Sequence, residues 1–140
     1  MEIFPISLKL QGQPCLIVGG GHIAYRKAVL LAKAGAVIHV VAPDIEQNLL
    51  DIVHSTHGQY HADKFDPQIS LSSYRLVIAA TNDKAVNQAV FEACEDLNVL
   101  VNSVDDPPHC RFMVPAIIDR SPLVVSIATN GASPVLSRQI

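Results

Sequence analysis

Residues 14–42 read PCLIVGGGHIAYRKAVLLAKAGAVIHVVA, and this stretch decides the fold. Its first five residues form a short apolar run that stops at three glycines, which is typical of a buried parallel strand followed by a turn. From His22 to Ala34 apolar residues recur at helical spacing, and Gly35 stands where a helix C-cap is expected. Residues 37–42 are again apolar and rich in β-branched side chains. The stretch therefore predicts a strand, a helix and a second strand, which form one βαβ unit.

The alternation of strands and helices continues downstream. The sequence patterns predict a helix over 45–53, a strand over 59–62, a strand over 76–80, a helix over 84–97 and a strand over 100–103. Strands that alternate with helices form a parallel sheet with helices on both faces and right-handed crossovers. The predicted fold class is therefore a doubly wound α/β fold.

The pattern changes after these strands, because four prolines interrupt short apolar runs. Two further short strands are predicted, over 116–118 and 123–128. Ser133 and Pro134 are residue types favoured at the N-cap and the first position of a helix. The chain is therefore expected to stop about two turns into a C-terminal helix.

Composition excludes several classes of protein. Of the 140 residues 49% are apolar and 16% are charged, which suits a globular domain and argues against disorder. No apolar run reaches the ~18 residues that cross a bilayer, and the N-terminus does not resemble a secretion signal, so no membrane association is expected. A net charge of −3 offers no general attraction for nucleic acid. Three cysteines without a C-x-x-C pair indicate a reducing, cytoplasmic setting and no zinc site.

The segment GGGHIA from Gly19 to Ala24 matches the pattern G-x-G-x-x-A between a predicted strand and a predicted helix. In this pattern Gly19 allows a tight turn, Gly21 lets a pyrophosphate approach the backbone, and Ala24 lets the helix pack closely against the strand. The helix N-terminus adds free amide groups and the positive end of a dipole. We therefore predict a dinucleotide site, with a glycine turn that binds no ligand as the alternative.

Asp44 follows the second predicted strand, about 20 residues after the glycines, where an acidic residue binds the ribose hydroxyls of NAD. The alternative is that Asp44 caps the helix predicted to start at Ile45. No Arg or Lys is close to this strand end in the sequence to meet a 2′-phosphate. The sequence therefore favours NAD over NADP.

Polar residues also follow the later strands. Asp105 and Asp106 come just after the fifth strand, and a carboxylate at that edge could accept a proton while hydride leaves to NAD. The alternative is that this Asp-Asp-Pro-Pro segment is only a turn. Thr81, Asn82 and Asn102 could hydrogen-bond a cofactor or could simply cap secondary structure.

Longer segments carry a more specific signal. The blocks FMVPAIIDRSPL and GASPVLSR, together with LVIAATND and NSVDDP, resemble the NAD-binding domain of siroheme synthases and of stand-alone precorrin-2 dehydrogenases. The resemblance extends from about Phe4 to Ile140. It implies a Rossmann-type fold and the NAD-dependent oxidation of precorrin-2 to sirohydrochlorin on the way to siroheme. In many members of this family the same site also inserts Fe²⁺.

The resemblance also implies roles for particular residues. His22, Ile23, Pro43 and Asp44 match the segments that contact NAD in the family. Asp105 matches the aspartate assigned as general base and implicated in metal chelation. Arg and Lys side chains are expected to meet the carboxylates of the tetrapyrrole.

Family members continue past this segment into a helical region that helps to form a dimer and to cover the substrate. The resemblance therefore implies an NAD-binding domain over 1–112 and the start of the dimerisation and substrate-covering region over 113–140. We expect a homodimer in the longer form and weak activity from the 140-residue chain. Two alternatives remain open, a non-catalytic NAD-binding or assembly module and an unrelated small-molecule NAD dehydrogenase.

Overall fold

A computed structural model describes residues 1–128 of the chain. The chain forms two compact units. The larger is Lys9–Phe112, and the smaller combines Met1–Leu8 with the described residues from Met113 onward. The C-terminal helix predicted from Ser133 lies outside the described residues.

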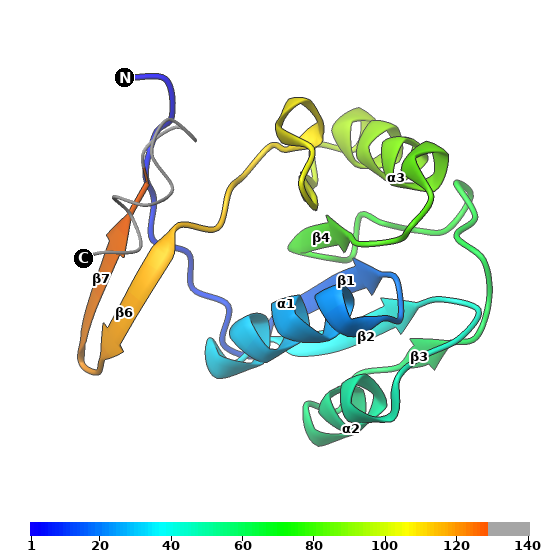
Figure 1. Ribbon diagram of the computed structural model, residues 1–140, viewed down its shortest axis with the longest axis horizontal. Coiled ribbons are helices and arrows are strands. Elements are labelled where there is room, and N and C mark those ends of the chain that lie inside the picture. The colour runs from blue at the N-terminus through cyan, green and yellow to red at the C-terminus, as the bar shows by residue number, and fades with distance from the viewer. Residues whose placement is uncertain (129–140) are drawn as a thin grey trace. The chain divides into compact units, whose positions relative to one another are not determined.

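Strands and helices alternate along the larger unit (Figure 1). The elements are β1 Pro14–Val18, α1 His22–Lys33, β2 Val37–Val41, α2 Gln47–Ser55, β3 Tyr60–His61, β4 Leu76–Ala79, α3 Lys84–Asp96, β5 Leu100–Ser103 and the short 3₁₀ helix η1 Pro107–His109. The five strands form one parallel sheet in the order β3-β2-β1-β4-β5. The predicted doubly wound α/β fold is thus confirmed.

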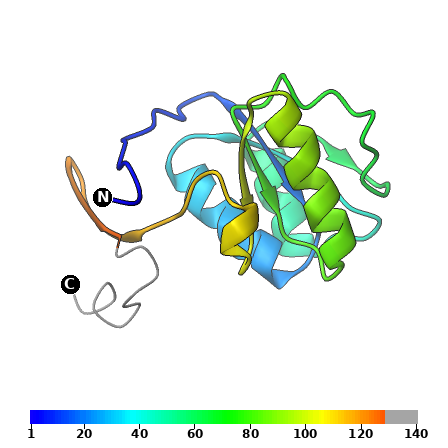
Figure 2. The ribbon, with the colours of Figure 1, turned by 90° about the horizontal axis from the view of Figure 1, so that it is seen from above.

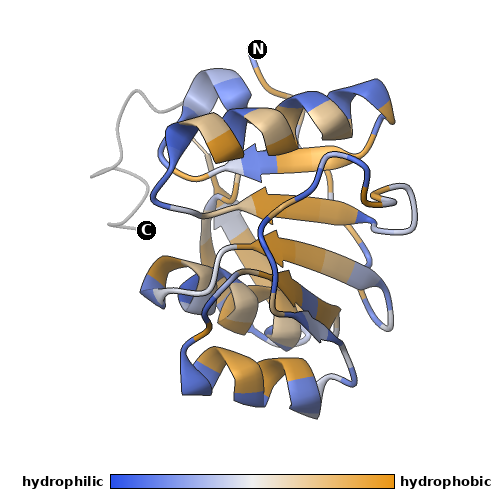
Figure 3. Ribbon diagram, turned by 90° about the vertical axis from the view of Figure 1, so that its right-hand side faces the viewer, coloured by the Kyte–Doolittle hydropathy of each residue, from blue (hydrophilic) through white to orange (hydrophobic). Residues whose placement is uncertain are grey.

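Helices cover both faces of this sheet, with α1 and α2 on one face and α3 on the other (Figure 2). Side chains alternate between the two faces along a strand, so neighbouring residues of β1 enter different cores. Ile17 packs in one core with Ala28 of α1 and Leu49 of α2, whereas Leu16 packs in the other with Val90 of α3. Figure 3 shows the apolar strands enclosed between these helices.

The carboxyl ends of all five strands lie at one edge of the sheet. Val18 is paired with both Val41 and Ala79, and these in turn are paired with His61 and Ser103. Because β1 lies between β2 and β4, the chain order reverses beside β1. In open α/β sheets this reversal leaves a crevice beyond the strand ends, where ligands bind.

The start of α2 differs from the sequence-based expectation. The predicted helix began at Ile45, but α2 begins at Gln47 with Glu46 as its N-cap. Glu46 keeps an extended backbone (ψ 144°), and its N–H donates a hydrogen bond to the carbonyl oxygen of Gly20 at 2.9 Å. A contact with the distant glycine turn therefore delays the helix by two residues.

The smaller unit contains an antiparallel hairpin of β6 Ala116–Arg120 and β7 Leu123–Ile127, joined by a cis Ser121–Pro122 peptide bond. The two extra strands predicted in this region are confirmed. No residue of either strand is buried, and Leu123 is 64% exposed. Within residues 1–128, no helix is both long enough and apolar enough to cross a bilayer.

Candidate functional site

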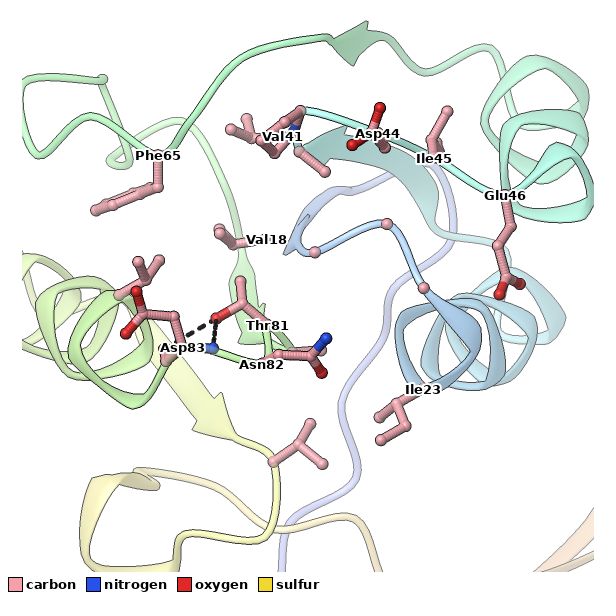
Figure 4. A pocket seen from close by; sticks show the side chains of 18 of the residues that line it. Val18, Ile23, Val41, Asp44, Ile45, Glu46, Phe65, Thr81, Asn82 and Asp83 are labelled. Atoms are coloured by element: carbon pink, nitrogen blue, oxygen red, sulfur yellow. Dashed lines mark hydrogen bonds between the residues drawn. The ribbon is translucent and has the colours of Figure 1, made fainter.

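A cavity of about 1140 Å³ opens at the carboxyl edge of the parallel sheet (Figure 4). Its lining comes from the strand ends and the loops that follow them, at 18–23, 41–46, 64–65, 80–83 and 104–105, with Val86 of α3. Asp44, Phe65 and Thr81 come from three separate loops and face one opening (Figure 4). The crevice expected from the strand order is therefore present.

The glycine turn forms one wall of this cavity. Gly19 has φ +132°, a conformation that L side chains rarely adopt, and a Cβ there would collide with the carbonyl oxygen of Ala80. Its N–H donates a hydrogen bond to the carbonyl oxygen of Val41 at 3.0 Å. The backbone therefore requires glycine at this position, as the tight turn predicted from the motif demands.

The N-terminus of α1 faces the same cavity. Gly21 is the N-cap of α1, no side chain caps the helix, and no acidic residue lies in its first turn. The first intrahelical bond comes from Tyr25, whose N–H donates to the carbonyl oxygen of Gly21 at 3.0 Å. The preceding amides thus have no partner within the helix, as is usual at a helix start. A Cβ on Gly21 would meet nothing within 4 Å, so a ligand can approach this backbone closely.

Ala24 lies under the turn and is fully buried. It belongs to the core that α1 shares with β1, together with Ile17. Its part in the motif is therefore to let helix and strand pack closely rather than to touch a ligand.

Asp44 lines the cavity beyond the end of β2 and is exposed. The hydroxyl of Tyr60 donates a hydrogen bond to the carbonyl oxygen of Ala42 at 2.8 Å and so braces this loop. Burial and the nearby Asp44 carboxylate raise the pKa of Tyr60. The alternative in which Asp44 caps α2 is wrong, because the N-cap is Glu46. The Asp44 carboxylate remains available to a ligand.

The wall after β4 is held by a buried asparagine. The hydroxyl of Thr81 donates a hydrogen bond to Oδ1 of Asn87 at 2.7 Å, and Asn87 is only 8% exposed. Asp83 caps α3, since its carboxylate accepts a hydrogen bond from the N–H of Ala85 at 2.9 Å. Thr81 therefore lines the cavity with its hydroxyl already engaged, while Asn82 lines it from an exposed position.

The two aspartates after β5 have different surroundings. Asp105 lines the cavity, is exposed and has φ +58°, a left-handed conformation that Asp tolerates better than most residues. Asp106 does not line it, and its Oδ2 lies 2.6 Å from Nδ1 of His109. Within residues 1–128 the Asp105 carboxylate has no hydrogen-bond or ion-pair partner, so it is the free acid of the pair.

Asn102 is not among the residues that line the cavity. It is 8% exposed, and its Nδ2 donates a hydrogen bond to the carbonyl oxygen of Phe112 at 3.0 Å. A buried amide needs such a partner, because an unpaired one costs free energy. The structure thus gives Asn102 a part in fixing the chain after β5.

Glu46, Lys64 and Phe65 also line the cavity, although sequence reasoning did not select them. Glu46 was assigned to a helix, and the other two follow the short strand β3. The argument that no cation approaches the end of β2 is wrong, because pairing of β3 with β2 brings Lys64 there. In open α/β sheets ligands bind beyond the carboxyl ends of the strands, and this rule applied to β3 would have identified Lys64 and Phe65.

Three features of the cavity together define a dinucleotide-binding domain of the Rossmann type: the glycine turn, the N-terminus of α1 and the acidic residue beyond β2. The family NAD_binding_7, described as "Putative NAD(P)-binding", matches residues 6–116. The chain belongs to this family.

Two siroheme synthases are similar to the chain over its whole length. The protein of Acinetobacter baylyi is 64% identical over 140 residues, which are 100% of this chain and 31% of the relative. The protein of Chromobacterium violaceum is 48% identical over 140 residues, 100% of this chain and 30% of the relative. The chain thus spans less than a third of the length of these relatives, and the resemblance to siroheme synthases is confirmed.

A solved structure described as "SirC, precorrin-2 dehydrogenase" is also similar. It is 29% identical in sequence with a TM-score of 0.78, and the match covers 98% of this chain and 67% of that chain. The similarity therefore covers almost the whole of this chain.

Proposed function

We propose that the chain is the NAD-dependent dehydrogenase domain that oxidises precorrin-2 to sirohydrochlorin in siroheme biosynthesis. One observation carries the proposal: the glycine turn, the N-terminus of α1, Asp44 and Asp105 all line one cavity. The similarity to siroheme synthases and to SirC supports this substrate. A binding module without catalysis would not need the Asp105 carboxylate, which lines this cavity and has no partner among residues 1–128.

The residues around the cavity fit a dinucleotide. A pyrophosphate would lie against Gly19–Gly21 and accept hydrogen bonds from the free amides that start α1, including those of His22 and Ile23. The ribose hydroxyls would donate to the exposed Asp44 carboxylate, beside Pro43. When bound, NAD supplies the acceptor for a hydride. Thr81 would border the cofactor as part of the wall, since its hydroxyl is already bonded to Asn87.

Asp105 would accept the proton in this reaction. Forming sirohydrochlorin removes two hydrogens from precorrin-2, one as hydride and one as a proton. The Asp105 carboxylate is exposed at the cavity and free of protein partners within residues 1–128, whereas Asp106 is paired with His109. The structure thus supports Asp105 as the base, in line with its position in the family pattern.

The test compares Asp105→Asn with Asp106→Asn in the longer natural protein, with precorrin-2 and NAD. General-base catalysis contributes about 10²–10⁴-fold, so Asp105→Asn should lose roughly that factor in kcat while its affinity for NAD, measured by calorimetry, is retained. Asp106→Asn is the matched control and should lose far less. If Asp105→Asn keeps a turnover close to that of Asp106→Asn and of the parent, Asp105 is not the base. NAD binding without any turnover by the parent would instead favour a non-catalytic module.

We also propose that the longer protein is a homodimer formed through the hairpin unit. Ile117, Leu123 and Val124 are 43%, 64% and 57% exposed, and an isolated two-stranded hairpin is at best marginally stable. A second copy would cover these apolar side chains. Light scattering on the longer protein should give twice the chain mass, and Leu123→Glu should shift the protein toward monomer.

Two further parts of the proposal rest mainly on the family resemblance. The longer protein would insert Fe²⁺ into sirohydrochlorin at the same cavity, with the Asp105 carboxylate taking up pyrrole protons. It would do so in the cytoplasm, which the unpaired thiols of Cys15, Cys94 and Cys110 support. Siroheme formation from sirohydrochlorin and Fe²⁺ is measured by absorbance, and Asp105→Asn should slow it.

A further inference from the structure

We propose that Lys64 faces the 2′ position of the adenosine ribose and lets the cavity accept a 2′-phosphate. The chain would then bind NADP in addition to NAD, although the sequence alone argues against NADP. The inference rests on the proposed dinucleotide function. It assigns a residue that sets the choice between two cofactors.

Strand pairing brings Lys64 to the ribose side of the cavity. Val40 and Val41 of β2 are paired with Tyr60 and His61 of β3, so the chain after β3 runs past the end of β2, just before Asp44. The next residue, Phe65, packs against the core under α3 and anchors the segment. Among the residues that line the cavity, all of which the structure describes, Lys64 is the only Lys or Arg.

The charge of Lys64 is not used elsewhere in the described part of the chain. Among residues 1–128 no carboxylate lies within 4.0 Å of its ammonium group, since the ion pairs there are those of His109 and Arg111. Its side chain is exposed. A lysine without a partner at the edge of a ligand cavity can meet an anionic group of that ligand.

A second hollow provides room for such a group. It has a volume of about 290 Å³ and shares Val41 and Lys64 with the main cavity. The other residues around it are His61, Asp63, Asp66, Gln68 and Ile69. A ribose held near Asp44 therefore has space beyond Lys64 for a substituent larger than a hydroxyl.

The surrounding charges set how strong the effect is. A phosphate monoester carries about −1.5 to −2 charges near neutral pH, and Asp44 alone would repel it. Lys64 opposes this repulsion, while Asp63 and Asp66 weaken its attraction from the side of the second hollow. The expected result is a site that still prefers NAD, with a preference smaller than Asp44 by itself would impose.

The experiment measures the affinities of NAD and NADP by calorimetry for the parent chain, Lys64→Ala and Lys33→Ala. Lys33 is the matched control, because it is exposed in the last turn of α1, at the end away from the glycine turn. Lys64→Ala should weaken NADP binding about 5- to 10-fold, since it removes one exposed cation facing a doubly charged group. NAD binding should change less than about twofold, which is the range expected for a surface charge without a direct partner. Lys33→Ala should change neither.

A third variant, Asp44→Ala, should improve NADP binding relative to NAD, because it removes the opposing charge. Equal changes for both cofactors in Lys64→Ala, or no change for either, would overturn the role of Lys64 while leaving dinucleotide binding intact. A parent chain that binds neither NAD nor NADP would instead overturn the proposed function, and the inference with it.

Discussion

The substitution Gly21→Asp should separate ligand binding from folding. Gly21 has φ −93°, which any residue can adopt, and a Cβ there would meet nothing within 4 Å. It is also the N-cap of α1, a position where Asp is slightly better than Gly, by a few tenths of a kcal/mol. The free energy of unfolding should therefore stay within about 0.5 kcal/mol of the parent value, or rise.

Dinucleotide binding should fall steeply in the same variant. A carboxylate at Gly21 would accept hydrogen bonds from the first-turn amides of α1, which are the donors that we propose for the pyrophosphate. It would also repel a phosphate at the turn, and two like unit charges about 6 Å apart repel by about 3 kcal/mol at an effective dielectric constant of about 20. With screening by salt, about 2–3 kcal/mol remains, which corresponds to a loss of roughly 30- to 150-fold in affinity.

The assay combines calorimetric titration with NAD and urea unfolding of the same samples. Gly21→Ala is the uncharged control and should lose less affinity than Gly21→Asp. Gly19→Ala is the control for folding, because φ +132° and the collision with the carbonyl oxygen of Ala80 should cost about 2–4 kcal/mol of stability. A folded Gly21→Asp variant that binds NAD within twofold of the parent would refute the placement of the pyrophosphate at this turn.

Two other predictions concern groups outside the cavity. Burial raises the pKa of all three thiols, that of Cys15 to about 11 and that of Cys94 to about 12. Cys15 and Cys94 are also fully buried, whereas Cys110 is partly exposed, so at about pH 8 an alkylating reagent should modify only Cys110 in the folded chain. Mass spectrometry should show one adduct, which Cys110→Ser removes, and two or more adducts would contradict the burial of the other thiols. The hydrogen bond and the charge of Arg111 lower the pKa of Glu95 below its ordinary value of 4.5. The pair therefore stabilises the fold above about pH 4.5, and this stabilisation is lost as the pH falls through the lowered pKa. Arg111→Gln should therefore flatten the acid side of the stability–pH profile measured by urea unfolding, and an unchanged profile would show that the pair contributes nothing.

The sequence by itself determined the framework of the protein. The segment 14–42 predicted β1, α1 and β2 to within about a residue, because apolar periodicity and glycine position act within a few neighbours. Gly19 was assigned to a tight turn for the same local reason, and its φ of +132° agrees. The family resemblance selected Asp105 over Asp106, and among residues 1–128 it is Asp106 that has an ion-pair partner, His109, whereas Asp105 has none.

Only the tertiary structure decided which side chains meet at the cavity. Lys64 lies there because β3 pairs with β2, a contact between segments about 20 residues apart that no local pattern encodes. Asp44 is free to bind a ligand because the N–H of Glu46 is bonded to Gly20 and α2 therefore starts later. Asn102 does not line the cavity, because its buried amide donates a hydrogen bond to the carbonyl oxygen of Phe112. Burial without that hydrogen bond would cost free energy. Local sequence thus specified the elements, whereas the pairing of strands and the need to satisfy buried polar groups specified the site.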